Sequence, residues 1–393
     1  MRKLPLLLLS LLPVQAAAVE VRFHPGDAVY TYEVDPGRGL STVVLQNVAV
    51  VQTDAEPVTL ESLEIQAVSK GQVTQTQIVP PEDLEKSAQR LSAMEAQGAL
   101  KLYDFYFQTS RYLNGIRLSP DRTLKTGTAL VVFGKPLLLA GKPEQIVVIA
   151  RAKNAAGQPV EARGSLRVEE HRSPNEYHFP LAGTWYVGAA PSLHSHHRWV
   201  TNQEFALDLV ALGGDGHTYK GQGNRLDDYY AYGRDVLAVA DGVVVEAVSD
   251  ATEGNDGLRQ PGESTEDYDK RSAMAQNELL AKSPKAIAGN YVILRHEGGE
   301  HSNYIHLKQG SVKVKAGDTV KRGQTIGQLG HTGNSTEPHL HFQLTDGPDP
   351  LYSRGLPIVF KNTAIEGMGL EGRPLQTGWI VNTQGKDGKD NKN

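Results

Sequence analysis

The residues best suited to chemistry are histidines and one aspartate in the second half of the chain. Ten of the 13 histidines lie between His194 and His341. Side chains two residues apart in a strand point to the same side, so we expect His339 and His341 to share one face. Asp208 lies in an apolar stretch, and a buried carboxylate needs a cationic partner. A metal ion is one candidate partner and an arginine is another.

A catalytic zinc site has three protein ligands and one open position. Asp208, His341 and one histidine from the group at 194–197 would supply such a set. Two other interpretations fit the same residues. The paired histidines could be solvated on an exposed strand face, and Asp208 could form a structural salt bridge.

A series of short strands must position these residues. The pattern predicts strands at 236–240, 243–248, 291–296, 302–306, 312–314, 325–328 and 340–344. The stretch 249–288 interrupts them with eight acidic residues, five basic residues and one aromatic residue, Tyr268. Such a composition builds little core, so we interpret it as a surface insertion that is either mobile or folded over the site, with a short helix at 273–280.

The first half of the chain shows period-two alternation and many turn residues over 19–168, which predicts an antiparallel sandwich. One helix is expected to start at Pro80-Pro81 and to end at Gly98. The aromatic stretch Tyr103, Phe105, Tyr106 and Phe107 is interpreted as core. We divide the chain into an N-terminal β-rich domain at 19–170 and a second domain at 171–382.

The termini and the composition limit the compartment and the partners. Arg2 and Lys3 precede an apolar run and then Ala16-Ala17-Ala18, which is typical of a secretory signal peptide at 1–18. A polar tail at 383–393 is expected to be disordered. The net charge is −5 and no basic stripe is present, which argues against nucleic-acid binding. No cysteine and no segment long enough to cross a membrane are found.

Several glycine-punctuated segments occur in one order and resemble a known family. They are GRDVLAVADGVV at 233–244, GNYVILRH at 289–296, GDTVKRGQTIG at 317–327 and the stretch GHTGNST at 330–336 before the late histidine pair. Together with Tyr304-Ile305-His306-Leu307, they make residues from about 177 to 344 similar to the lysostaphin-like zinc endopeptidases, which cut peptide bridges in bacterial peptidoglycan. The N-terminal half is not part of the resemblance.

The resemblance implies one Zn²⁺ per chain with His197, Asp208 and His341 as its ligands. It also implies catalytic, non-ligating roles for His306 and His339.

The chain departs from the family pattern at two places. The first histidine lies eleven residues before the aspartate, where the family often has four. The choice among His194, His196 and His197 therefore stays open, with His197 preferred and His196 second. Glu337, where the family often has glycine, would narrow or acidify the cleft.

The resulting prediction is a mostly β protein, with an N-terminal sandwich-like domain followed by an antiparallel lysostaphin-like peptidase domain. We expect an exported zinc endopeptidase of the periplasm or cell envelope, which hydrolyses peptidoglycan peptide cross-links through a metal-activated water. Its partners would be peptide stems. The alternatives are an inactive activator of another cell-wall hydrolase, a peptidoglycan-binding module, and a carrier domain suggested by the hairpin at 317–327. The N-terminal domain could position the enzyme, bind a partner or cover the groove.

Overall fold

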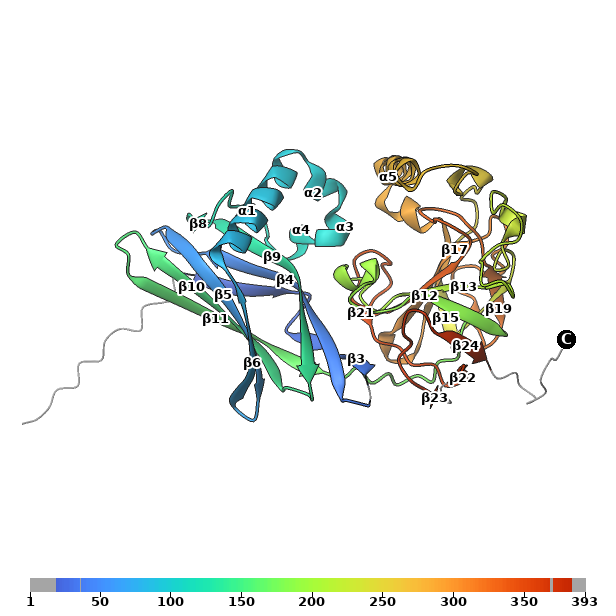
Figure 1. The fold of residues 1–393 in the computed structure, drawn as a ribbon, viewed down its shortest axis with the longest axis horizontal. Coiled ribbons are helices and arrows are strands. Elements are labelled where there is room, and N and C mark those ends of the chain that lie inside the picture. The colour runs from blue at the N-terminus through green and yellow to red at the C-terminus, as the bar shows by residue number, and fades with distance from the viewer. Residues whose placement is uncertain (1–18, 36, 368–369, 384–393) are drawn as a thin grey trace, which may run out of the picture.

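The computed structural model describes residues 19–35, 37–367 and 370–383. The predicted signal peptide at 1–18 lies outside the described residues, and so does the predicted tail except for Thr383, which ends the last strand. The protein is mostly β, as predicted, with the two halves of the chain side by side (Figure 1). Among the described residues, no helix is long and apolar enough to cross a membrane.

The N-terminal half contains two β-sheets. The first has the strand order β1 (Val19–His24), β4 (Leu40–Gln52), β9 (Thr128–Ala140) and β7 (Arg117–Leu118), with β3 (Tyr32–Asp35) also paired to β4. The second has the order β2 (Ala28–Tyr30), β11 (Pro159–Glu169), β10 (Gln145–Asn154), β5 (Val58–Ser69) and β6 (Gln72–Val79), with β8 (Thr123–Leu124) paired to β5. Most pairs are antiparallel, and β7–β9 and β2–β11 are parallel.

The strand β4 is buried along almost its whole length because both of its faces are covered. Val43 and Leu45 pack in one core cluster with Ile65 of the second sheet. Ala49 and Val51 pack in another cluster under helices. A strand covered on both faces reads as a continuous apolar run, and burial of each large apolar side chain contributes roughly 1.5–3 kcal/mol.

Helices cover the outer face of the first sheet (Figure 1). The helix α1 (Pro81–Ala96) begins with proline and an acidic first turn, and Gly98 follows it with a φ of 72°. Both features were expected from the sequence. Three short helices follow: α2 (Ala99–Leu102), α3 (Asp104–Phe107) and α4 (Thr109–Tyr112).

The C-terminal half is built on an 11-stranded sheet of described residues. Its order is β18 (Thr319–Val320), β15 (Gly242–Val248), β16 (Asn290–Arg295), β17 (His301–Leu307), β20 (Leu340–Thr345), β13 (Leu207–Val210), β12 (Thr184–Ala189), β24 (Ile380–Thr383), β22 (Thr363–Ile365) and β23 (Leu370–Glu371), with β21 (Gly355–Leu356) paired to β20. A separate pair joins β14 (Asp235–Leu237) to β19 (Thr325–Gln328). Short 3₁₀ turns are η1 (His196–Trp199), η2 (Leu226–Asp228), η3 (Asn255–Gly257), η4 (Pro284–Ala288) and η5 (Glu297–Gly299).

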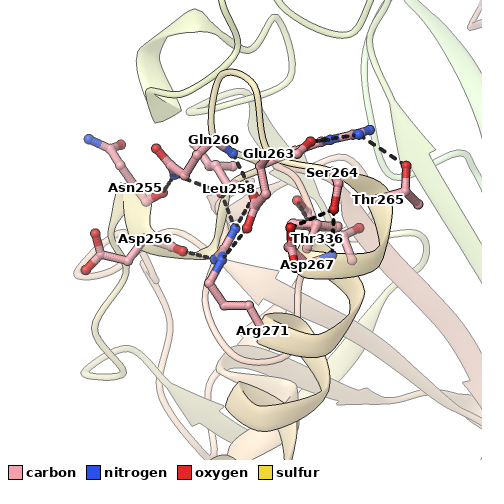
Figure 2. Close-up of polar contacts among 12 residues, drawn as sticks. Asn255, Asp256, Leu258, Gln260, Glu263, Ser264, Thr265, Asp267, Arg271 and Thr336 are labelled. Atoms are coloured by element: carbon pink, nitrogen blue, oxygen red, sulfur yellow. Dashed lines mark hydrogen bonds and ion pairs between the residues drawn. The ribbon is translucent and has the colours of Figure 1, made fainter.

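The segment 249–288 folds into η3, the helix α5 (Thr265–Lys282) and η4 between β15 and β16. The helix begins eight residues before the predicted position, because Ser264 caps it by accepting a hydrogen bond from the backbone N–H of Asp267 at 3.1 Å. Arg271 ties the segment together through two bonds to Glu263 at 2.8 and 2.9 Å and one to the Leu258 carbonyl at 2.9 Å (Figure 2). Leu258 is fully buried, so this segment has a small core of its own.

A buried ion pair lies where the two halves meet. The guanidinium of Arg198 is fully buried, donates to Glu204 at 2.7 Å and also donates to the Thr42 carbonyl on β4 at 3.3 Å. The amide of Gln46, also on β4, donates to the Arg198 carbonyl at 2.9 Å. A charge this deeply buried needs such partners, so the loop carrying Arg198 can take up this position only against the N-terminal half.

Candidate active site

Three potential metal ligands converge at one place in the C-terminal half. Asp208 on β13 lies directly opposite His341 on β20 in the antiparallel register. The Asp208 carboxylate is 3.0 Å from Nδ1 of His341 and 2.8 Å from Nε2 of His197, which belongs to η1. The structure thus brings the three residues together on one carboxylate.

The eleven-residue spacing between His197 and Asp208 is accommodated by a loop that folds back on itself. Ser195 caps η1 by accepting from the backbone N–H of His197 at 3.3 Å. Beyond His197, the Arg198–Glu204 pair closes the loop at 2.7 Å. The long spacing therefore leads the chain out to the N-terminal half and back.

The other two candidate histidines of this group are exposed. The ring centroid of His196 lies 3.9 Å from that of His197, and a nitrogen of His196 belongs to one compact group with His197 and Asp208, in which all donor atoms lie within 4.8 Å. His194 does not line the cavity described below. Burial and the short distance to Asp208 favour His197, and His196 stays the second candidate.

Hydrogen bonds reveal which ring nitrogen of His341 faces the carboxylate without a proton. The amide nitrogen of Gln343 donates to the Pro350 carbonyl at 2.9 Å, so its oxygen faces Nε2 of His341 at 3.1 Å and must accept a proton from it. The Nδ1 lone pair of a neutral His341 then points at an Asp208 oxygen. Two acceptors 3.0 Å apart repel unless a cation lies between them, which is the donor chemistry of a metal site.

The electrostatics of the cluster agree with a cation-binding role. Burial opposes ionisation of Asp208, yet His197, His339 and the histidine hydrogen bonds hold the pKa of this carboxyl well below its usual range. Burial lowers the pKa of His341. Burial also disfavours a charged His197, but the neighbouring carboxylate outweighs it and raises the pKa of that imidazole.

His306 and His339 lie beside this cluster with their rings 4.9 Å apart. The Nδ1–H of His306 donates to the Thr332 carbonyl at 2.7 Å, and the Nδ1–H of His339 donates to the Glu337 carbonyl at 2.7 Å. Each neutral ring therefore keeps a free lone pair on Nε2. Burial, followed by the charges of His339 and His341, holds the pKa of His306 well below its usual value, so this ring is a neutral acceptor at neutral pH.

A cavity of about 460 Å³ covers all five residues, and its walls come from both halves of the chain. One wall carries the histidines, Asp208 and apolar side chains such as Ile287 and Ile305. The opposite wall comes from α1 to α3 and includes Arg90, Tyr103 and Tyr106. Figure 1 shows these helices facing the C-terminal half. Such a concave, partly apolar space with convergent polar groups is typical of a ligand site.

Two sequence expectations around the cavity change with the structure. Phe105 and Phe107 are buried, as expected for core, but the aromatic stretch also lines the cavity, which the sequence analysis did not foresee. The carboxylate of Glu337 accepts a hydrogen bond from Thr218 at 2.6 Å and lines a neighbouring pocket. It does not line the catalytic cavity, so the expectation that it narrows or acidifies that cavity is wrong.

Comparison with known proteins agrees with the geometry. The family model described as peptidase family M23 matches residues 272–352, a segment that contains His306, His339 and His341. The predicted family resemblance is confirmed. The match does not extend to His197 or Asp208, so their assignment depends on the geometry given above.

Similar proteins include two named peptidoglycan-related enzymes. Peptidoglycan DD-endopeptidase ShyC of Vibrio cholerae serotype O1 is 51% identical over 55 residues, which are 14% of this chain and 12% of that protein. Lysostaphin of Staphylococcus simulans is 40% identical over 102 residues, which are 25% of this chain and 20% of that protein. This chain therefore aligns with a fifth or less of the length of these two relatives. The solved catalytic domain of lysostaphin from the same organism is 21% identical, with a TM-score of 0.24 over 44% of this chain and 88% of that chain.

The sequence analysis missed the two glutamines that orient the ligand rings. Gln203 lies 2.9 Å from Nδ1 of His197, and Gln343 lies 3.1 Å from Nε2 of His341. Gln343 could have been found, because it is two residues from His341 and shares its strand face. Gln203 lies in the loop between His197 and Asp208, where no periodic pattern marks it.

Proposed function

We propose that this protein is a zinc-dependent endopeptidase that hydrolyses peptide cross-links of peptidoglycan. The observation that carries the proposal is the Asp208 carboxylate, which faces an unprotonated nitrogen of His341 and lies 2.8 Å from His197. Two imidazoles and one carboxylate form a donor set that suits zinc with an open fourth position. When bound, the ion would polarise the scissile carbonyl and lower the pKa of a water molecule.

The remaining chemistry is proton transfer by this chain's own histidines. His306 and His339 each offer a free Nε2, and Nε2 of His339 is 3.6 Å from the Asp208 carboxylate. We assign proton abstraction and stabilisation of the tetrahedral oxyanion to this pair. Backbone carbonyls hold both rings through Nδ1, so the tautomer needed for accepting a proton is already in place.

The choice of substrate rests on the relatives. The curated relatives named above are a peptidoglycan DD-endopeptidase and lysostaphin. We infer that peptide stems are the substrate and that the protein acts in the cell envelope, where peptidoglycan lies. The cavity of about 460 Å³ is large enough to hold several residues of an extended peptide.

Digestion of purified cross-linked muropeptides, followed by mass analysis, tests the proposal. Cleavage should stop with EDTA and return with added zinc. His306→Ala should keep its metal and lose activity by ~10²–10⁴-fold, since that is the usual contribution of a general acid or base. His194→Ala, which removes an exposed histidine outside the cavity, is the matched control. Binding of muropeptides without any cleavage would contradict the enzyme and support a binding module or a hydrolase activator.

A further inference from the structure

A second pocket adjoins the catalytic cavity on the N-terminal side. It has a volume of about 450 Å³ and lies between α1, β9 and the side chain of Trp199. Arg90, Tyr106 and Phe107 line both spaces, so the two are neighbours. Trp199 follows His197 by two residues, which ties this second pocket to the proposed metal site through η1.

The second pocket is rich in positive charge. Arg90, Lys86 and Lys135 line it, and Asp83 is the one acidic residue among its lining residues. Lys86 lies 3.5 Å from Asp83. Within the described part of the chain, neither Arg90 nor Lys135 has an acidic side chain within ion-pair distance. Two cationic side chains therefore remain available to a ligand.

The shape of the pocket depends on a close contact between the two halves. The ring of Trp199 lies over Gly134 of β9, where a Cβ would be 3.1 Å from a ring carbon. Gly134 also has a φ of 54°, which disfavours other residues. The half-buried indole thus forms a flat wall beside the two free cations, Arg90 on α1 and Lys135 on β9.

We propose that this pocket binds a carboxylate of the peptide whose scissile bond lies in the catalytic cavity, with Arg90 as the main contact and Lys135 as the second. The inference rests on the proposed function and adds a specificity determinant to it. The planar guanidinium of an arginine matches a carboxylate through two parallel hydrogen bonds, whereas a lysine acts as a point charge. Arg90 lies at the boundary of the two spaces, so a peptide extending from the histidines toward Trp199 passes this side chain.

The test compares two probes on the full-length mature protein. The probes are a purified cross-linked peptide-stem dimer with free carboxylates and the same dimer with its carboxylates amidated. Binding is measured by calorimetry on metal-free protein, and cleavage is measured on the zinc-loaded protein. Arg90→Ala and Arg90→Gln should weaken binding of the acidic dimer by about 10- to 100-fold and leave the amidated dimer unchanged. Lys135→Ala should have a smaller effect in the same direction.

Lys101→Ala is the matched control, because it removes an exposed cation from the neighbouring helix α2 that lines neither space. In cleavage, loss of Arg90 should raise KM and leave kcat near its normal value, as for an interaction made equally in ground state and transition state. If the wild type cleaves the dimers but Arg90→Ala binds and cleaves both as well as the wild type, the carboxylate site is wrong and the proposed function stands. If the wild type shows Arg90-dependent preference for the acidic dimer but never cleaves it, the proposed function fails and the carboxylate site stands. If the metal-free wild type binds neither dimer, the carboxylate site is wrong.

Discussion

Two segments border the catalytic cavity, one from each half of the chain, and they differ in almost every physical property. The α2–α4 segment at 99–112 supplies three aromatic rings and is anchored in a core shared with β4 and β9. The insertion at 249–288 supplies Gln276, Ile287 and Ala288 to the cavity. It is held mainly by the polar network around Arg271 (Figure 2). The apolar segment, which looked like ordinary core in the sequence, contributes more of the cavity wall than the polar insertion does.

The two segments also contact each other across the cavity. Tyr103 donates to the side chain of Asn277 on α5 at 2.5 Å. Phe105 packs in one buried cluster with Leu280 of α5 and Leu351. Because the catalytic histidines lie on β-strands below, the chemistry and its walls are built from separate parts of the molecule. The difference can be tested by removing each part in turn.

The largest effect is expected from Asp208→Ala, which removes the carboxylate that the proposed ligands share. Metal affinity should fall by more than about 100-fold, since even residues outside the ligand set are worth ~10–100-fold, and activity should be lost with the metal. Metal analysis and muropeptide digestion measure both. Asp215→Ala removes an exposed carboxylate from the same half and should change neither. Full zinc content in Asp208→Ala would overturn the ligand assignment.

The next effect concerns the apolar segment. Phe105→Ala should lower the free energy of unfolding by about 3 kcal/mol, because it leaves a cavity among Leu280, Leu351 and their neighbours. Urea denaturation measures the change. Leu102→Ala, at a residue that is 36% exposed in the same segment, should cost less than about 0.5 kcal/mol. Equal costs for the two variants would show that the cluster between the segments does not stabilise the protein.

A smaller effect is expected from shortening the insertion. Replacing 251–284 with a short Gly/Ser linker removes the self-contained Arg271 network and Gln276 but keeps Ile287 and Ala288 in the cavity wall. Folding and zinc content should be preserved, since long surface loops cost little to change. The rate or the preference among muropeptides should change several-fold. Unchanged cleavage of every muropeptide would mean that the insertion is passive.

The smallest effect should come from Tyr103→Phe, which removes the exposed hydrogen bond to Asn277 and keeps the ring. We expect a loss of about 0.5–1 kcal/mol in the free energy of unfolding. A double-mutant cycle with Asn277→Ala isolates this pair, because neighbouring residues are the ones that fail to add. A coupling energy of zero would mean that the two segments do not hold each other in place.

Local pattern explains what could be predicted from the amino-acid sequence. The mostly β class, the helix from Pro81 to Ala96 and the shared face of His339 and His341 all follow from side-chain period and from turn or cap residues a few positions away. The segments that carry the family resemblance were likewise visible as short runs in a fixed order. For these features the physical cause lies within about ten residues of the effect.

Tertiary structure decided the choice of His197 and the origin of the cavity walls. His197 is oriented by a loop whose buried Arg198 bonds to Thr42, 156 residues earlier in the chain. The wall that carries Arg90 meets the histidines only because the two halves pack together. Such contacts leave no periodic trace, since they depend on the shapes of two folded surfaces rather than on neighbouring residues. The sequence could therefore name the chemical groups, while the packing of the two halves determined which histidine faces Asp208 and what surrounds them.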